Sequence, residues 1–490
     1  MDFVFSTVVW GPWHTGVYLD VNLPSLLASG NLAAFAQKHR VKYRIFTSSC
    51  DIARIEACPA YRRAREMVPF ELIACPVEQA PNPIAMHHQL WRRSIEETRE
   101  AGAMILFVPP DVIWSNGSFR HVAEHFERGK RAVFMTYMRV ISETCVPEVR
   151  RLHLAQDGVT IDAPSRRLVE LALQHIHPLA LTSLRDSPNF SIHPELILWP
   201  IAGEGFLMRV LVREMFAYDP RLFELNQQAL PAEAPDPDLV HYITDSDDLF
   251  SLSLAPVAKD ADWYARPQRL DPLKIGNWWL TYDSPANDFV ASRYFYVHSV
   301  SRTPEKWRRA EIESDMVMKR IVGTREVLRV LSAIARDETR YAQQLLMLAL
   351  VETKLAYVAH SSNPITVLIP PNPAVRRWMF EERETLTKPR LSRKLMDVVR
   401  DYVILGPLPL KPGKEADLKT ARGGDRKLTW LGNLPLIDGV ALQLPGFPLG
   451  ADWSYTKDGW AFIIDGVLPP AETGTEKRRL PVDLRRKLPG

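Results

Sequence analysis

The first 140 residues alternate short apolar runs with segments of helical spacing, and this alternation limits the available folds more than any other feature of the sequence. Runs rich in β-branched and aromatic residues predict strands at 3–10, 41–47, 70–75, 104–108 and 132–137. Apolar residues at helical spacing predict helices at 23–38, 52–67, 87–101 and 118–126. Because strands and helices alternate, we expect an α/β fold whose mostly parallel sheet is flanked by helices.

The pattern changes twice further along the chain. Residues 141–300 mix a helix at 166–177 with short strands at 195–199, 239–244 and 294–297. Helical periodicity then dominates 303–358 and returns at 376–402, whereas Pro and Gly interrupt the last 90 residues or so. We therefore expect a catalytic or binding domain over 1–300, a C-terminal helical layer over 301–402, and an irregular C-terminal extension with a basic tail over 403–490.

Composition excludes several classes of protein. The 490 residues are 46% hydrophobic and 24% charged, which is ordinary for a globular protein and argues against disorder and fibrous repeats. The formal net charge is only +3, so no nucleic-acid partner is expected, because phosphate binding needs a concentrated basic stripe. The basic cluster in the last fifteen residues is interpreted as a solvated tail.

The cysteines and the apolar segments indicate in which compartment of the cell we expect the protein. The four cysteines contain no C-x-x-C pair, which predicts reduced thiols and neither a disulfide framework nor a structural zinc site. The N-terminus has Asp2 where a signal peptide needs a basic residue, and the apolar stretch 345–358 is shorter than a bilayer span and carries charges. We expect a cytoplasmic protein with no transmembrane segment, and we leave peripheral membrane contact open.

The segment from Asn82 to Tyr137 resembles the middle of bacterial-type nucleotide-sugar glycosyltransferases of the GT-A fold. In that family a helix leads into an apolar strand that ends in Asp-x-Asp, followed by a turn and another helix. The matching parts here are the helix 87–101, the strand 104–108, Pro109-Pro110-Asp111 and the turn 115–118. The resemblance extends over residues 1–140 and more loosely over 141–300.

The resemblance implies a fold, an activity and a set of ligands. It implies a GT-A-like domain that transfers a sugar from a nucleotide-sugar donor to a hydroxyl of a glycan, lipid or protein acceptor. It also implies that Thr7, Thr47 and Asp51, at the ends of the first two strands, contact the nucleotide. These roles are expectations that rest on the family alone.

The sequence departs from the family at its metal-binding motif. The family's Asp-x-Asp chelates Mn²⁺ or Mg²⁺, a hard cation that neutralises the diphosphate leaving group. Here Pro109 replaces the first aspartate, and Asp111 matches the second. A weakly held metal, a metal-independent mechanism and a loss of catalysis all remain open, as does a turn in which Asp111 only bonds backbone N–H groups.

Further candidates follow other strands. Asp245 and Asp247 lie two residues apart after a strand, so in an extended segment both carboxylates face one way and could supply a general base, with Asp245 slightly preferred. The alternative is an acidic turn.

Trp278 and Trp279 could stack on a sugar ring, although aromatic residues at this density also form cores. His298 ends an aromatic strand and could bind a metal or a phosphate.

A competing motif occupies residues 121–125. His121-Val122-Ala123-Glu124-His125 matches H-x-x-E-H, in which two histidines one helical turn apart bind zinc and the glutamate activates water. The sequence offers Glu195 and Glu204 as third ligands but assigns neither. The alternative is an ordinary solvated helix face.

Other catalytic motifs are missing from the sequence. It has no Walker-type G-x-x-x-x-G-K, no G-x-S-x-G and no complete dinucleotide-binding loop, which disfavours nucleotide hydrolysis, serine hydrolysis and hydride transfer. The main hypothesis is therefore sugar transfer. A non-catalytic protein that binds glycans or partners on a degenerate GT-A fold is the second hypothesis, and a zinc hydrolase is the third.

Overall fold

The computed structural model divides the chain into two compact units. One unit comprises Met1–Leu270 with Tyr282–Ser314, and the other comprises Asp271–Thr281 with Asp315–Gly490. The described residues are 1–77, 82–191, 193–213, 215–223, 237–258, 267–282, 284–333, 364–373, 375, 393–444, 446–448 and 460–468. The division falls within a continuous helix, α14 (Pro304–Ala333), rather than at the expected boundary near residue 300.

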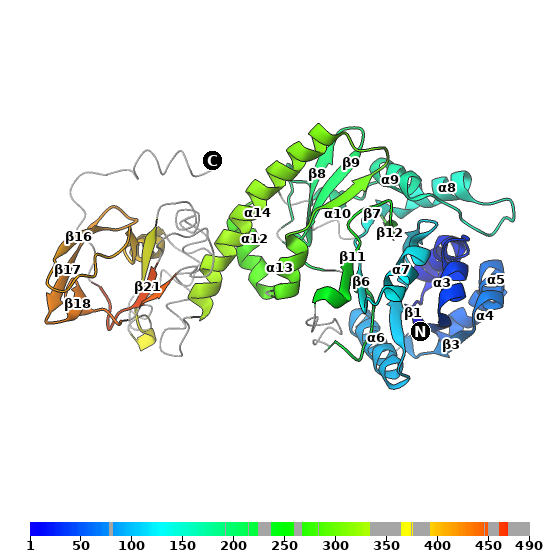
Figure 1. Ribbon diagram of the computed structural model, residues 1–490, viewed down its shortest axis with the longest axis horizontal. Coiled ribbons are helices and arrows are strands. Elements are labelled where there is room, and N and C mark those ends of the chain that lie inside the picture. The colour runs from blue at the N-terminus through cyan, green and yellow to red at the C-terminus, as the bar shows by residue number, and fades with distance from the viewer. Residues whose placement is uncertain are drawn as a thin grey trace. The chain divides into compact units, whose positions relative to one another are not determined.

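A seven-stranded sheet forms the centre of the first unit (Figure 1). Its strands are β1 (Asp2–Val8), β2 (Arg40–Thr47), β3 (Phe70–Ala74), β4 (Met104–Phe107), β6 (Ala132–Phe134), β10 (Met215–Tyr218) and β11 (Val240–Tyr242). The order is β11-β6-β10-β4-β1-β2-β3, and only β10 runs antiparallel to its neighbours. The expected mostly parallel α/β sheet is therefore confirmed.

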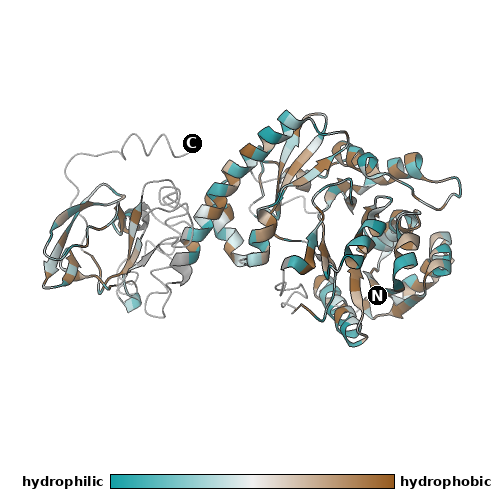
Figure 2. Ribbon diagram, viewed as in Figure 1, coloured by the Kyte–Doolittle hydropathy of each residue, from teal (hydrophilic) through white to brown (hydrophobic). Residues whose placement is uncertain are grey.

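Helices cover both faces of this sheet. Successive strand residues point to opposite faces, so Met104 and Leu106 pack toward α3 (Leu32–Lys38) and α7 (Ser118–Glu127), whereas Ile105 and Phe107 pack toward α6 (Pro83–Glu100). The Ser94 hydroxyl of α6 donates to the Ser6 hydroxyl of β1 at 2.8 Å. Burial on both faces explains why β4 is apolar throughout, and Figure 2 shows brown, hydrophobic segments in the interior of this unit.

Two of the expected helices are divided by local chemistry. The expected helix 52–67 is α4 (Ser49–Ala57) and α5 (Pro59–Met67), because Cys58 precedes a proline and adopts an extended conformation. The expected helix 23–38 is α2 (Leu23–Leu26) and α3, preceded by α1 (Pro12–Val17) and the π-helix η1 (Tyr18–Asn22). Between α2 and α3, Gly30 lies so close to Gly117 that a Cβ would be 2.6 Å from its backbone.

Two smaller sheets pack around α9 (Ser165–Gln174) in the same unit. One contains β5 (Val112–Trp114), β12 (Ser251–Ala255) and β7 (Met138–Ile141), and the other contains β13 (Phe295–His298), β9 (Gly205–Val210) and β8 (Leu196–Ile201). Four further elements of this unit are α8 (Ser142–His153), α10 (Pro178–Leu181), η3 (Pro237–Leu239) and α13 (Pro285–Ala291), and η4 (Leu280–Tyr282) spans the division between the two units.

The second unit is richer in strands than expected. It contains α12 (Pro272–Trp279), α19 (Arg393–Arg400) and two four-stranded sheets. The strands are β14 (Ile365–Ile369), β15 (Val403–Leu405), β16 (Ala416–Lys419), β17 (Asp425–Leu431), β18 (Leu434–Ile437), β19 (Val440–Ala441), β20 (Phe447–Pro448) and β21 (Trp460–Ile463). The sequence predicted hairpins or irregular structure here.

Parts of the sequence predictions lie outside the described residues. These are the helices expected at 334–358 and 376–392, and the basic tail at the C-terminus. In the part of the chain that the structure describes, no helix is both long and apolar enough to cross a bilayer.

Candidate functional site

A pocket of about 510 Å³ opens where β1, β4 and β6 end. Its walls come from the segments that follow these three parallel strands, together with α1, α6 and the sheet of β5, β7 and β12. Bulky apolar side chains dominate the lining: Trp10, Trp91, Phe107, Trp114 and Phe216. Ligands of open α/β sheets bind at this edge, so this pocket is the candidate site.

The loop after β4 carries Asp111 into this pocket on a fixed backbone. The side-chain amide of Asn22 donates to the carbonyls of Pro109, at 2.8 Å, and Val112, at 2.6 Å. The Asp111 carbonyl accepts from the Leu254 N–H at 2.7 Å. Asp111 therefore lines the pocket at the strand end where the sequence predicted it.

Arg139 is the second charged residue of the pocket, and the sequence analysis missed it. It belongs to β7 and is partly exposed. Within the described residues no carboxylate forms an ion pair with its guanidinium. A partly buried cation that lacks a counter-ion in the described part of the chain is suited to an anionic ligand.

Two ring nitrogens in the pocket lining also have no partner. Among the described residues, His87 Nε2 and Trp114 Nε1 are buried and make no hydrogen bond. Burial, followed by the nearby His88 and His14, lowers the pKa of His87 to about 4, so this imidazole is neutral at pH 7. Buried polar groups are normally satisfied, so these two nitrogens are exceptions, although neighbouring atoms cover both of them.

The three residues expected to contact the nucleotide do not line the pocket. Thr7 is fully buried, and its hydroxyl contacts the Tyr43 hydroxyl at 2.8 Å and donates to the Val108 carbonyl at 2.9 Å. Thr47 is also fully buried. Asp51 caps local backbone instead, accepting from the Gly11 N–H at 3.0 Å and from the Ser48 hydroxyl at 2.9 Å. The side chains of Thr7 and Asp51 therefore bond the protein itself, whereas the Thr47 hydroxyl is buried and makes no hydrogen bond within the described residues.

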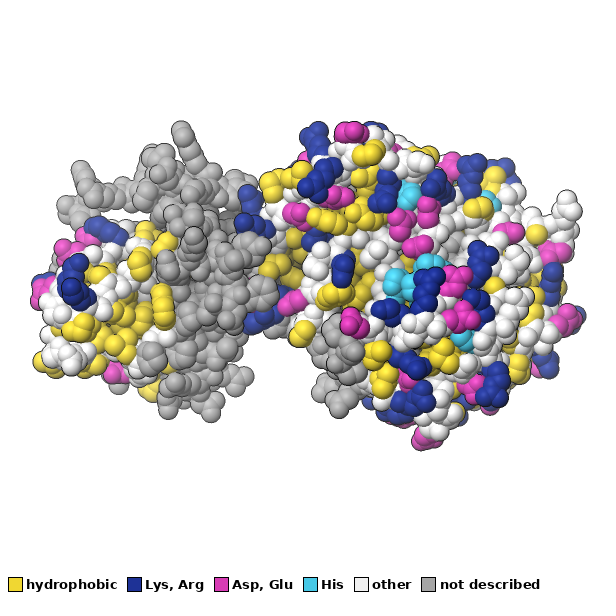
Figure 3. All heavy atoms as spheres, in the orientation of Figure 1, with side chains coloured by type: hydrophobic (Ala, Val, Ile, Leu, Met, Phe, Trp, Pro, Cys, Tyr) yellow, Lys and Arg dark blue, Asp and Glu magenta, His cyan; other side chains and the backbone are white. Residues whose placement is uncertain are grey.

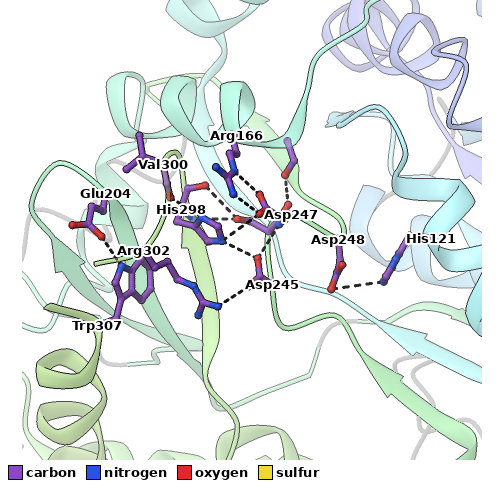
Figure 4. A network of polar contacts seen from close by, with 12 residues as sticks. His121, Arg166, Glu204, Asp245, Asp247, Asp248, His298, Val300, Arg302 and Trp307 are labelled. Atoms are coloured by element: carbon purple, nitrogen blue, oxygen red, sulfur yellow. Dashed lines mark hydrogen bonds and ion pairs between the residues drawn. The ribbon is translucent and has the colours of Figure 1, made fainter. Parts of the chain in front are cut away.

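Asp245, Asp247 and His298 come together in a separate ion-pair network (Figure 4). His298 Nε2 lies 2.9 Å from Asp245 Oδ1 and 3.9 Å from Asp247 Oδ2. Figure 4 shows an arginine on each side: Arg302 is 3.4 Å from Asp245, and Arg166 is 2.8 Å from Asp247. None of these residues lines the pocket that holds Asp111.

The charges of this network are balanced internally. Both nitrogens of His298 face acceptors, Asp245 Oδ1 and the Val300 carbonyl, and the hydrogen bond with Asp245 raises the pKa of His298 despite burial. Burial raises the pKa of Asp245, but its hydrogen bonds to His298 and to the Asp247 N–H outweigh this effect and lower it. A doubly protonated imidazole has no lone pair for a metal, and a carboxylate of lowered pKa is a weaker base. The spacing of the three ligand atoms, within 4.8 Å, would suit a cation, but this arrangement favours an ion-pair network.

Trp278 and Trp279 belong to α12 in the second unit. Trp279 is fully buried, and the Arg325 guanidinium lies over its ring at 3.8 Å. Its ring therefore has no exposed face for a sugar. Trp278 is partly exposed.

The H-x-x-E-H segment lies on α7, and its two histidines meet a third. His125 Nε2 is 3.0 Å from His121 Nε2, and the His125 ring stacks on that of His241 with 3.4 Å between centroids. His241 belongs to β11, and sequence reasoning did not single it out. Of the two glutamates considered as third ligands, Glu204 instead binds Lys306 and the Trp307 indole N–H.

Comparisons with known proteins assign no family to this chain. No protein-family model matches the sequence. No curated protein matches it either. A structural match is a FAS1 domain pair from the insect cell adhesion molecule fasciclin I, at 16% sequence identity and a TM-score of 0.19. That match covers 27% of this chain and 47% of the other, so the chain spans about half of the matched structure, and we draw no argument from so low a score.

Proposed function

We propose that the pocket beside Asp111 binds a nucleotide-sugar and that the protein transfers its sugar to a hydroxyl acceptor. The observation that carries this proposal is Arg139, which no carboxylate of the described residues pairs, in the same aromatic-lined pocket as Asp111, at the carboxyl edge of a mostly parallel sheet. The aromatic walls suit a base or a sugar ring, and the guanidinium suits a diphosphate. The GT-A resemblance of residues 82–137 supports the same assignment.

The charged side chains of the pocket are compatible with a bound divalent cation. Among the described residues that line the pocket, Asp111 is the carboxylate, and Mg²⁺ is commonly held by one or two carboxylates together with substrate phosphates and water. Asp111 would hold Mn²⁺ or Mg²⁺ against the diphosphate, and the cation would neutralise the charge of the leaving group. Arg139 would bind the remaining phosphate charge. Pro109, in place of a first aspartate, leaves the site with less negative charge than Asp-x-Asp provides.

The proposal does not assign a general base. Asp245 and Asp247 were candidates from the sequence, but His298, Arg302 and Arg166 hold both carboxylates outside the pocket lining. The proposal therefore rests on the pocket that holds Asp111 and Arg139, where the sugar donor would bind.

Replacing Asp111 by Asn tests the assignment. We expect donor turnover, measured as release of nucleoside diphosphate from a panel of UDP-, GDP- and CDP-sugars with Mn²⁺, to fall by about 100-fold or more, the scale on which loss of one electrostatic stabiliser lowers kcat. Unfolding stability should change by only about 0.5 kcal/mol. Asp20→Asn is the matched control, because Asp20 is exposed and does not line the pocket. Wild-type turnover by Asp111→Asn would contradict the assignment.

The second candidate function is binding without transfer, which the loss of the first aspartate at Pro109 favours. In that case the wild-type protein would bind a nucleotide-sugar and release no diphosphate with any acceptor. Product release by wild-type protein would exclude this candidate.

A further inference from the structure

Three histidines from two elements converge on one point of the first unit. His121 and His125 lie one turn apart on α7, and His241 lies on β11. One ring nitrogen from each can be chosen so that all three lie within 4.8 Å of one another. Figure 3 shows histidine side chains gathered on this face of the molecule.

One separation within the cluster is close to what a tetrahedral metal requires. Two ligands at the Zn–N distance of about 2.0–2.1 Å in tetrahedral geometry are roughly 3.3 Å apart. His121 Nε2 and His125 Nε2 are 3.0 Å apart. A single N–H···N hydrogen bond accounts for this pair alone, and the His241 ring, which stacks on His125, has to turn before both ring planes contain one metal ion.

The charges around the cluster are mixed. Asp248 Oδ2 lies 3.9 Å from His121 Nε2 and adds negative charge at the rim, as Figure 4 shows. Arg128 and Lys130 add positive charge, which weakens cation binding. Other groups hold the ends of these side chains, however: Glu124 is 3.9 Å from Arg128, and the Asp238 carbonyl accepts from Lys130 at 2.6 Å.

We propose that His121, His125 and His241 form a binding site for a divalent transition metal of the zinc type, with a fourth coordination position left for water. Imidazole ligands select zinc and its neighbours rather than Mg²⁺ or Ca²⁺. The site differs from the H-x-x-E-H interpretation of the sequence because a histidine of β11, not a downstream glutamate, completes it. It is also independent of the nucleotide-sugar proposal, since none of the three residues lines the Asp111 pocket.

Metal analysis of the full-length protein without a histidine tag tests the site. We expect one equivalent of zinc per chain, which EDTA removes, and Co²⁺ added to the stripped protein should give the intense visible absorption of tetrahedral coordination. His241→Asn should weaken Co²⁺ binding by about 100-fold or more, at or beyond the upper end of the 10–100-fold cost of losing an outer-shell partner. His175→Asn is the matched control, because His175 lies at the end of α9 and bonds Thr144.

Each outcome decides the proposal. Stoichiometric binding that His175→Asn keeps and His241→Asn loses supports it. The proposal is overturned if the protein retains no zinc and gives no Co²⁺ spectrum. It is also overturned if His241→Asn and His175→Asn bind Co²⁺ equally. If circular dichroism shows that His241→Asn is unfolded, the same titration with His121→Asn replaces it and is judged in the same way.

Discussion

At the scale of single residues, the surroundings of the aspartates differ sharply. Asp111 lies in a pocket with Arg139, which no described carboxylate pairs. Asp245 is held between His298 and Arg302, so its charge is already balanced. The same side chain therefore suits a ligand site in one place and an internal ion pair in the other, and only the neighbours distinguish them.

The pH dependence of stability tests the His298–Asp245 pair. The pKa of His298 is raised in the folded protein, so the protonated ring stabilises the fold fully below its unfolded pKa of about 6.5, and this contribution is lost as the pH rises through the folded pKa. Asp245, Asp247 and Arg302 are the charged groups around the ring. We expect the melting-temperature advantage of wild type over His298→Gln to be largest near pH 6 and to shrink toward pH 9.

The difference between wild type and His298→Gln must be used, because other histidines change the stability of the fold with pH in the opposite direction. The pKa values of His87, His125 and His241 are lowered, so protonation of these residues in the unfolded chain destabilises the fold as the pH falls below about 6.5. Their effect is common to both proteins and cancels in the difference. An advantage that grows with pH would contradict a charged His298.

At the scale of elements, the pairing of β9 with β13 positions the ion-pair network. His298 lies opposite Gly205 in the register of these two antiparallel strands. Gly205 has a φ of 153°, and a Cβ there would be 1.9 Å from the Val297 carbonyl oxygen. The strands can approach this closely only because residue 205 has no side chain.

Gly205→Ala should therefore separate the two strands. We expect a loss of about 1–3 kcal/mol of stability, as for other overpacked sites, and a melting temperature lower by several degrees. The control is Gly16→Ala in α1, where a Cβ would meet only the movable Arg54 guanidinium, at 3.3 Å, and alanine favours the helix. Equal melting temperatures for Gly205→Ala and wild type would show that the close approach has no energetic consequence.

Local sequence predicted some elements better than others. The strands β1 to β4 are rich in apolar, β-branched and aromatic residues, so their composition was sufficient, and Pro59 explains why one expected helix is two. β5 and β7 were missed because three or four residues carry little periodicity. Their pairing with β12 depends on residues more than 100 positions away, which a local pattern cannot show.

At the scale of the whole molecule, the sequence predicted a mostly parallel sheet and the place of Asp111 at its edge. It could not predict which distant segments meet there. Arg139 reaches the pocket from β7, and His241 joins α7 from β11, more than 100 residues after His125. Thr7 and Thr47 lie at the correct strand ends, but their side chains are buried in the interior, because both faces of the sheet are covered at these positions.

Nucleotide binding tests the central claim most directly. Melting temperatures of the full-length protein would be measured with UDP, GDP and CDP, and with their sugars, each with Mn²⁺, Mg²⁺ or EDTA. The account predicts that one nucleotide stabilises the protein, by about 2.7 kcal/mol at 100 times its Kd. The stabilisation should be greater with metal and should be largely lost in Arg139→Gln and Asp111→Asn but kept in Asp20→Asn. A well-folded protein that no nucleotide stabilises, or an undiminished shift in both pocket variants, would contradict it.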